Sequence, residues 1–262
     1  MARSATLNVM IQAAEKAARG LKRDFGEVEH LQVSRKGPDD FVSIADQKSE
    51  ETLYKELLKA RPDFAFLMEE SGEKGDPRAE NRWIIDPLDG TTNFLHGIPH
   101  WSISIAWECK GEIRAGVIYD PIKDEMFFAE KGSGAFLNSR RLRVSSRKDM
   151  SMASMATGVT PRYEKTHEAW LKQIKQVLPA SGGIRRLGSA ALDLAYVAAG
   201  RYEGYWENMA NAWDVAAGKL LVTEAGGHVT RVDGKKYALG SHDILATNDN
   251  LHTAIVKLLK SA

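Results

Sequence analysis

The sequence has very little cysteine, since Cys109 is the only one in 262 residues. A disulfide within the chain is therefore excluded. Cys109 lies in the apolar alternation SISIAWECK, so we expect a small buried side chain rather than a catalytic thiol. The chain also lacks an excess of either charge, with 36 Lys and Arg against 35 Asp and Glu. This balance excludes a general electrostatic attraction to nucleic acid or anionic lipid.

Long hydrophobic runs are missing as well. The amino-terminal stretch MARSATLNVMIQAAEKAARGLKRDF is interrupted by Gln12, Glu15 and Lys16, so it matches neither a signal peptide nor a membrane span. No other segment has the length or the apolar character of a membrane span, and we expect a cytoplasmic protein. Internal repeats and low-complexity tracts are also absent from the sequence.

The composition is that of a globular protein, with 43% hydrophobic and 27% charged residues. A chain of this length can bury a large core without dividing into separate modules. We therefore expect a single domain, residues 1–262, built from two packed halves at roughly 1–145 and 146–262.

Hydrophobic periodicity predicts an α+β fold. Apolar residues at helical spacing predict helices at 7–21 and from Ala45 to Pro62, and strands are expected at 64–70 and around Trp83. The alternating stretch 102–144 predicts an antiparallel meander of roughly five strands. The second half then alternates, with helices in HEAWLKQIKQVL, ALDLAYVAAG, WDVAAGKLLVTEAGG and DNLHTAIVKLLK, and strands near Ile184, Tyr202 and Ile244. This order favours a layered α+β architecture.

Two carboxylates follow a buried-strand pattern in RWIIDPLDGTTNF. Asp86 and Asp89 lie on a turn with Pro87 and Gly90, directly after the apolar stretch. Two carboxylates on such a rigid support can face one hard cation. The alternative is that both side chains make only Asx-type hydrogen bonds within the turn, which Pro87 and Gly90 shape.

Other acidic residues also stand at the ends of expected elements: Glu69 and Glu70 in MEES, Asp46 in SIAD, and Asp214 in NAWD. Mutual repulsion would make such a cluster unstable without cations, whereas Mg²⁺ would keep it ionised and leave coordination sites for phosphate oxygens. The cluster therefore predicts a metal and an anionic ligand. The spacing does not decide which glutamate points inward, and Asp214 by itself is also typical of a helix N-cap.

These motifs resemble the inositol monophosphatase family. The resemblance rests on WIIDPLDGTTNF, WDVAAGKLLVTEAGG, DFVSIADQKSE, MEES and GSAALDLAYVAAGRYEGYWE, which occur in the family's order over nearly the whole chain. The sequence is most similar to the bacterial branch often called the extragenic suppressor type. The resemblance implies a layered αβαβα sugar-phosphatase fold, Mg²⁺-dependent hydrolysis of inositol monophosphate, inhibition by lithium, and a homodimer.

The resemblance also implies roles for individual residues. Glu69, Asp86, Asp89, Asp214 and the Leu88 carbonyl would bind two to three Mg²⁺ ions. Thr91 and Glu69 would orient or deprotonate the attacking water, and Asp46 would hydrogen-bond to Thr91, although an N-cap role for Asp46 is the alternative. The substrate would contact Asp89, Gly90, Thr91, Ala191, Glu207 and Asp214. Lys36, in RKGPDD, matches a family lysine near the site with less certain spacing.

The expected reaction is hydrolysis by a metal-activated water without a covalent phosphoenzyme. The alternatives with the same chemistry are fructose-1,6-bisphosphatase, histidinol phosphatase and nucleotide 3′-phosphatase, because these differ only in pocket residues. A different alternative is a regulatory protein that binds a macromolecular partner on the same scaffold, for example through Arg185 and Arg186. That edge is otherwise expected to contact a second subunit.

Two further motifs receive structural interpretations. His96 and His100 in HGIPH are expected on a solvent-facing loop rather than at a zinc site, because no third soft ligand accompanies them. Ser189 has no visible base partner and is expected to cap a helix.

Overall fold

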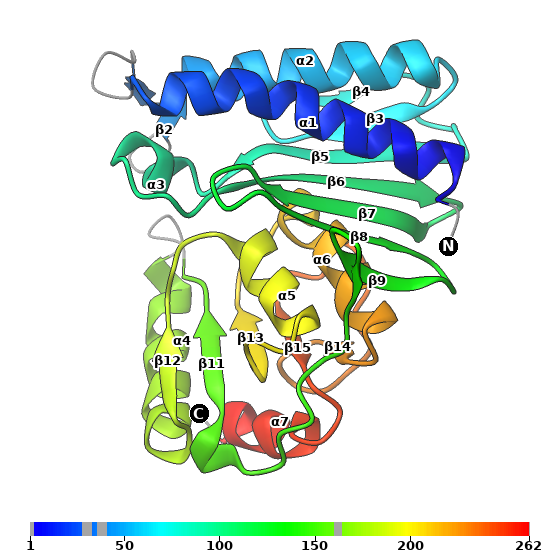
Figure 1. Ribbon diagram of the computed structural model, residues 1–262. Helices are drawn as coiled ribbons and strands as arrows, with labels where there is room; N and C mark the ends of the chain where they lie inside the picture. Colours follow the sequence, from blue (N-terminus) through cyan, green and yellow to red (C-terminus); the bar gives the residue numbers. More distant parts are fainter. Residues whose placement is uncertain (1–2, 28–32, 36–40, 160–163, 262) are drawn as a thin grey trace.

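The helices and sheets stack in five layers that alternate α, β, α, β and α (Figure 1). This computed structural model describes residues 3–27, 33–35, 41–159 and 164–261, with only the backbone at 33–35, 41–43 and 164–166. The predicted α+β class and the αβαβα layering are confirmed. Among the described helices, none combines the length and the apolar run needed to cross a bilayer.

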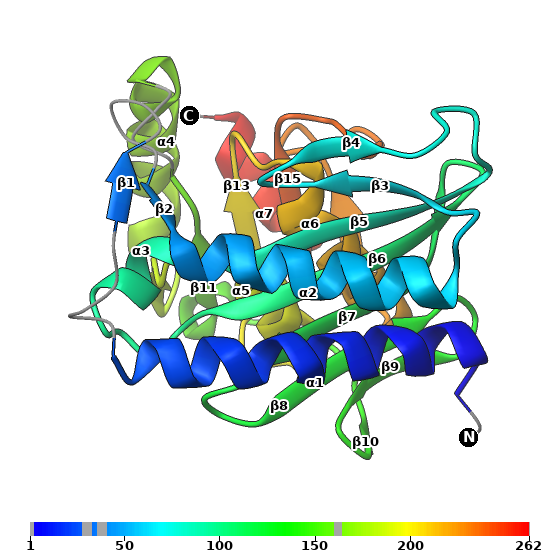
Figure 2. The same cartoon turned by 90° about the horizontal axis from the view of Figure 1, so that it is seen from above.

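The outer helical layer consists of α1 (Ala5–Phe25) and α2 (Ile44–Ala60), which lie side by side across the first sheet (Figure 2). Ser4 caps α1 by accepting a hydrogen bond from the Leu7 amide at 3.1 Å. The buried residues of α1 follow the predicted helical spacing and face the sheet. A short antiparallel pair, β1 (Val33–Arg35) and β2 (Phe41–Ser43), precedes α2.

The first sheet has eight strands in the order β10-β9-β8-β7-β6-β5-β3-β4. Its strands are β3 (Ala65–Met68), β4 (Gly72–Lys74), β5 (Asn81–Asp89), β6 (Ser102–Cys109), β7 (Glu112–Asp120), β8 (Glu125–Glu130), β9 (Gly134–Leu137) and β10 (Arg140–Arg141). The last five form the predicted antiparallel meander. Cys109 ends β6 and is half-buried, so the expectation of a buried side chain is wrong.

The middle layer, between the two sheets, contains α5 (Ala190–Ala198) and α6 (Ala212–Glu224). These two helices, together with the facing sides of both sheets, form the largest apolar cluster. The short helix α3 (Thr91–Leu95) lies at the end of β5. The amino ends of α3, α5 and α6 therefore come from segments that are far apart in the sequence.

The second sheet has five strands in the order β12-β11-β13-β15-β14. They are β11 (Ser154–Thr157), β12 (Gly183–Arg185), β13 (Gly204–Glu207), β14 (His228–Thr230) and β15 (Ile244–Thr247). The outermost layer, α4 (Glu164–Val177) and α7 (His252–Lys260), covers its far face. The strand expected near Tyr202 begins at Gly204. The strands expected near Ile184 and Ile244 are β12 and β15, whereas β11 and β14 were not expected.

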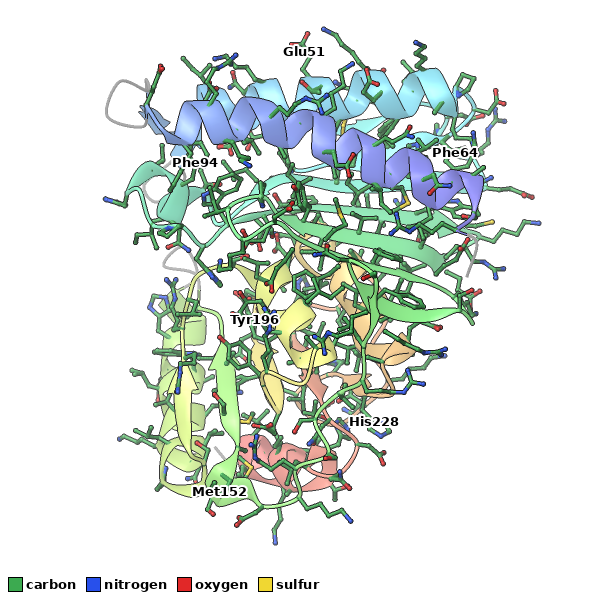
Figure 3. All side chains as sticks on the ribbon, viewed as in Figure 1. Glu51, Phe64, Phe94, Met152, Tyr196 and His228 are labelled. Atoms are coloured by element: carbon green, nitrogen blue, oxygen red, sulfur yellow. The ribbon has the colours of Figure 1, made fainter. Side chains whose placement is uncertain are left out.

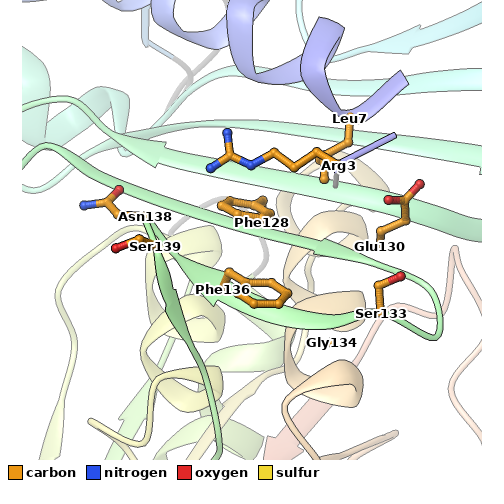
Figure 4. A pocket seen from close by; sticks show the side chains of 9 residues that line it. All are labelled: Arg3, Leu7, Phe128, Glu130, Ser133, Gly134, Phe136, Asn138 and Ser139. Atoms are coloured by element: carbon orange, nitrogen blue, oxygen red, sulfur yellow. The ribbon is translucent and has the colours of Figure 1, made fainter. Parts of the chain in front are cut away.

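A cavity of about 270 Å³ lies where the start of α1 meets the β8–β9 hairpin (Figure 4). Phe128 and Phe136 stack across neighbouring strands with their ring centroids 5.4 Å apart, and the Arg3 guanidinium lies 4.4 Å from the Phe128 centroid. The cavity is lined by none of the residues predicted for the functional site. That site lies elsewhere, at the end of β5.

Candidate active site

Asp86 and Asp89 lie in the last four residues of β5, at the end of the first sheet, so the expectation that they stand on a turn after the strand is wrong. The pairing of β5 with β6 shifts register between these two residues, so the strand bends where the carboxylates begin. Asp86 is buried, and its Oδ1 accepts a hydrogen bond from the Leu88 amide at 2.9 Å. The Ser49 hydroxyl on α2 stabilises this bend by donating a hydrogen bond to the Pro87 carbonyl at 2.8 Å. The Asx-type bond therefore exists, but it uses only one oxygen of Asp86.

Gly90 allows the chain to turn sharply into α3. Its φ of +96° is strained for any other residue, and a Cβ there would lie 3.1 Å from the His100 carbonyl oxygen. Helix α3 begins directly after Gly90, at Thr91. The Thr91 hydroxyl donates to the Leu88 carbonyl at 3.0 Å, which links two of the predicted site residues directly.

Asp89 is held by the amino end of α5, which belongs to the other half of the chain. Its carboxylate accepts hydrogen bonds from the Ser189 hydroxyl, the Ala190 amide at 3.3 Å and the Ala191 amide at 2.9 Å. Ser189 also caps α5, as predicted, by accepting from the Leu192 amide at 3.3 Å. Burial raises the pKa of Asp89 to about 6, although these hydrogen bonds act in the opposite direction.

Glu69 directly follows β3, which runs parallel to β5, so Glu69 reaches the same sheet edge as Asp86. Burial raises the pKa of Glu69 to about 8, and the neighbouring charges of Asp46, Glu70 and Asp89 add to the shift. The Glu69 and Asp86 carboxyl groups lie within hydrogen-bonding reach of each other. Burial raises the pKa of Asp86 well above its ordinary range, and the charge of Glu69 adds to this.

Asp214 joins these acids from the first turn of α6. Its carboxylate accepts a hydrogen bond from the Asn211 amide at 2.7 Å, and Asn211 is the N-cap. The alternative that Asp214 is itself the N-cap is therefore wrong. Burial raises the pKa of Asp214 well above its ordinary range, and the charges of Glu69 and Asp89 contribute.

Asp46 is buried in the first turn of α2, which begins at Ile44. Because Asp46 lies inside the helix, the alternative of an N-cap role is wrong for this residue too. Its charge helps to raise the pKa of Glu69, so it belongs to the same electrostatic cluster. Its hydrogen bond to Thr91 stays a prediction.

Glu207, at the end of β13, faces the site from the second sheet. The Tyr205 hydroxyl donates to its carboxylate. Burial raises the pKa of Glu207 to about 7, with the charge of Asp89 adding to the shift and the Arg186 guanidinium opposing it. Ala191 is fully buried, and its amide donates a hydrogen bond to the Asp89 carboxylate.

Asp193 and Asn93 are buried polar residues that the sequence analysis did not assign. Asp193 is 1% exposed, and burial together with the charges of Asp89 and Glu207 raises its pKa well above the ordinary range. A lone acid inside the apolar helix ALDLAYVAA was the available signal. Asn93 follows the DGTT turn and donates to two backbone carbonyls.

The two histidines of HGIPH differ. His96 is exposed, as expected, but His100 is 8% exposed and packs edge-on against Tyr196 of α5, with ring centroids 6.0 Å apart. The expectation of a solvent-facing loop is therefore wrong for His100. Its burial lowers its pKa to about 4.

The donor chemistry of this cluster fits a hard divalent cation, because carboxylates and a backbone carbonyl are the ligands that Mg²⁺ prefers. Within the described part of the chain, no three His, Cys, Asp or Glu side chains already surround one point in a metal-binding arrangement. Lys36 lies outside the described residues.

Comparison with known proteins identifies the family. The model of the inositol monophosphatase family matches residues 2–262. The chain belongs to this family. It is 53% identical over 260 residues to the Inositol-1-monophosphatase of Mesorhizobium japonicum, covering 99% of this chain and 98% of that protein. It is 46% identical over 228 residues to the Nus factor SuhB of Xylella fastidiosa, covering 87% of this chain and 82% of that protein.

A solved structure supports the same conclusion for the fold. The extragenic suppressor protein suhB from Bartonella henselae is 52% identical and superimposes with a TM-score of 0.95, covering 99% of this chain and all of that one. The inositol monophosphatase family member described here is therefore a phosphatase with the fold of its relatives, and the family is generally metal-dependent.

Proposed function

We propose that this phosphatase hydrolyses inositol monophosphate to inositol and phosphate with Mg²⁺ as cofactor. The observation that carries the proposal is the electrostatic convergence of Glu69, Asp86, Asp89 and Asp214 from three separate segments of the chain. Relatives named Inositol-1-monophosphatase, at 50–53% identity over nearly the whole chain, support the substrate.

Two to three Mg²⁺ ions would be held by the carboxylates of Glu69, Asp86, Asp89 and Asp214 and by the Leu88 carbonyl. When bound, the ions lower the pKa of water and offset the negative charge that grows on the phosphate and the leaving oxygen. The Asx-type bond to the Leu88 amide uses only Oδ1 of Asp86.

The attacking water would be oriented by Thr91 and Glu69. The Thr91 hydroxyl lies beside the Leu88 carbonyl, and a glutamate carboxylate such as that of Glu69 can accept a proton from the water. Asp46 would orient Thr91 from α2. Hydrolysis then needs no covalent intermediate, because water is the nucleophile throughout.

The substrate would lie between the two halves of the molecule. The Gly90 and Thr91 amides at the start of α3 would donate to the phosphate. Asp89, Asp214, Glu207 and the segment at Ala191 would contact the polyol, whose hydroxyls are the donors that carboxylates bind. Glu207 is supported by its position at the end of β13, close enough to Asp89 for their charges to interact.

We also propose a homodimer that uses the edge of the second sheet. Strand β12 is the edge strand, and the residues Arg185, Arg186 and Leu187 at its end are exposed. Light scattering during gel filtration should show a dimer, and Leu187→Glu should shift it to a monomer.

The cytoplasmic location and the role of Lys36 stay predictions.

The test is phosphate release from inositol 1-phosphate, fructose 1,6-bisphosphate, histidinol phosphate and adenosine 3′,5′-bisphosphate, with and without Mg²⁺. We expect a Mg²⁺-dependent preference for inositol 1-phosphate that Asp89→Asn abolishes and LiCl inhibits. Preference for another ester would replace the substrate and keep the chemistry. Equal turnover by wild type and Asp89→Asn would contradict the assigned site.

A regulatory role is the second candidate function. It is supported by relatives named Nus factor SuhB, at 40–46% identity. The test is whether Asp89→Asn, inactive as a phosphatase, can replace Nus factor SuhB in Xylella fastidiosa. Replacement by Asp89→Asn but not by Arg186→Glu would support partner binding through the β12 edge, and failure of both wild type and variant would exclude it.

A further inference from the structure

The two halves of the site are joined by a buried amide that carries no assigned role. Asn93, in the short helix α3, is 9% exposed. Its Nδ2 donates to the His100 carbonyl at 2.7 Å and to the Leu187 carbonyl at 2.7 Å. Both partners are acceptors, so both N–H groups of the amide are used and its orientation is fixed.

The second of these bonds spans the halves of the chain. Leu187 directly precedes Gly188 and Ser189, the turn that opens α5. Gly188 has a φ of +86°, and a Cβ there would lie 3.3 Å from the Asn93 Nδ2. Glycine is therefore what lets the turn come so close to the Asn93 amide.

The same turn delivers the donors that hold Asp89. The Ser189 hydroxyl and the Ala190 and Ala191 amides all bind the Asp89 carboxylate, and they follow Leu187 by two to four residues. Asp89 and Asn93 are likewise four residues apart on the other side. Two short segments thus contact each other at both ends, through Asp89 at one and Asn93 at the other.

We propose that Asn93 is a positioning residue for Asp89. By binding the Leu187 carbonyl, the Asn93 amide fixes the segment 187–191, so that Ser189 and the two amides meet the Asp89 carboxylate in one orientation. Without Asn93, this segment keeps its hydrogen bonds to Asp89 but loses the second contact that sets their direction. The orientation of Asp89 then varies, which weakens metal binding and substrate alignment at that carboxylate.

This inference rests on the proposed function, because it concerns Asp89 as a ligand of Mg²⁺. Removing a residue that orients a metal ligand typically costs 10-fold to 100-fold in metal affinity. Asn93 acts through a further hydrogen-bonded segment, so we expect the lower end of that range, about tenfold. The loss should affect Mg²⁺ binding and kcat in inositol 1-phosphate hydrolysis more than it affects folding.

The chain offers a matched control in Asn248. This residue is also buried, and its Nδ2 also donates to two backbone carbonyls, those of Ser145 at 3.0 Å and Arg147 at 2.8 Å. It follows β15 in the second half, and neither of these carbonyl partners belongs to the proposed site. Its Oδ1 also accepts from the Leu251 amide at 3.0 Å, so Asn248→Ala removes the same kind of carbonyl contacts and one hydrogen bond more, at a position outside the proposed machinery.

The experiment compares Asn93→Ala and Asn248→Ala with wild type by calorimetric titration with MgCl₂ alone, by the Mg²⁺ dependence of kcat, and by thermal unfolding. We expect both variants to lower Tm. Only Asn93→Ala should weaken Mg²⁺ binding by about tenfold. Unchanged Mg²⁺ binding in Asn93→Ala, or equal weakening in Asn248→Ala, would overturn the inference.

Gly188→Ala provides an independent variant should Asn93→Ala fail to fold. It leaves the Asn93 donors in place but puts a Cβ against them at a strained φ, and so displaces the same turn. We expect weaker Mg²⁺ binding here too, and wild-type binding by the folded variant would contradict the inference. If wild type itself binds no Mg²⁺, the proposed function fails and the inference with it, whereas normal wild-type binding with insensitive variants leaves the proposed function standing.

Discussion

The outer helices and the middle helices of this molecule are built differently. Helix α1 buries one stripe of side chains against the first sheet and exposes the rest to solvent. Helix α5, between the two sheets, is buried from Ala191 to Ala198 without interruption. Figure 3 shows the contrast, with Glu51 pointing outward from α2 and Tyr196 enclosed between the sheets. A helix that is covered on both faces has no solvent-exposed polar side. Its few buried polar residues therefore need a specific partner or a role at the proposed site.

The largest effect should come from breaking the acidic end of a middle helix. Asp214→Asn on α6 keeps an oxygen for the Asn211 amide but removes a charge from the proposed metal site. We expect kcat/KM to fall by about a thousandfold, or about 4 kcal/mol, with the fold retained. The control is Glu51→Gln on the outer helix α2, which should leave phosphate release unchanged. A similar loss in both variants would contradict the contrast between the layers.

A methyl group added inside the middle layer should strongly destabilise the protein. A Cβ at Gly218 of α6 would lie 2.5 Å from the Leu194 Cβ of α5, so the two helices must separate. We expect Gly218→Ala to lower the free energy of unfolding by about 3 kcal/mol in urea titrations.

We also propose that residues 1–262 unfold as one domain, with a single coincident transition by fluorescence and circular dichroism. Two separate transitions would contradict this.

Acid should destabilise the protein through the contact between His100 and α5. Burial lowers the pKa of His100 to about 4, so between pH 6.5 and 4 the unfolded chain binds a proton that the folded chain does not. Stability should therefore fall as the pH falls through this range, by about 2 kcal/mol from this residue. His100→Gln should remove that part of the pH dependence, measured by urea unfolding at pH 7 and 4.5. His96→Gln, at an exposed position, should retain it.

The smallest effect should come from adding the same methyl group to an outer helix. Gly20 lies inside α1, and a Cβ there would meet nothing within 4 Å. Gly20→Ala should raise the free energy of unfolding by about 0.5 to 1 kcal/mol, because alanine loses less backbone entropy in a helix. A destabilising result would show that the outer helix is as tightly enclosed as α6.

Much of the fold could be predicted from the sequence because its longer elements repeat a clear pattern. The α1 stripe and the strands 102–144 each extend over enough residues for their period to be recognised. The short strands β11 and β14 could not be found in this way, since their existence depends on neighbours in the second sheet. The N-cap alternatives for Asp46 and Asp214 failed because both residues lie in the first turn of their helices, where several polar residues can serve as caps.

The acidic residues of the site could be nominated from the sequence, and their placement could not. Asp86, Asp89 and Asp214 stand out because carboxylates rarely follow apolar strands or open apolar helices without a partner. Asp193 and Asn93 could not be predicted because a single buried polar residue forms no repeating sequence pattern. The residues that it contacts lie many positions away in the chain. The electrostatic interaction of Glu69 with Asp86 appears only once β3 pairs with β5, and that of Glu207 with Asp89 only once the two sheets are stacked.

The sequence by itself determined the fold class, the resemblance to the inositol monophosphatase family, and the carboxylates at the ends of helices and strands. Only the tertiary structure decided that the amino end of α5 donates hydrogen bonds to Asp89 and that His100 is buried against α5. The same is true of the hydrogen bond from Asn93 to the Leu187 carbonyl, which connects the two halves of the chain. The physical reason is the separation along the chain between the residues that interact. Periodicity and capping act over a few residues, whereas these contacts join segments about a hundred residues apart and form only when both sheets close on the middle helices.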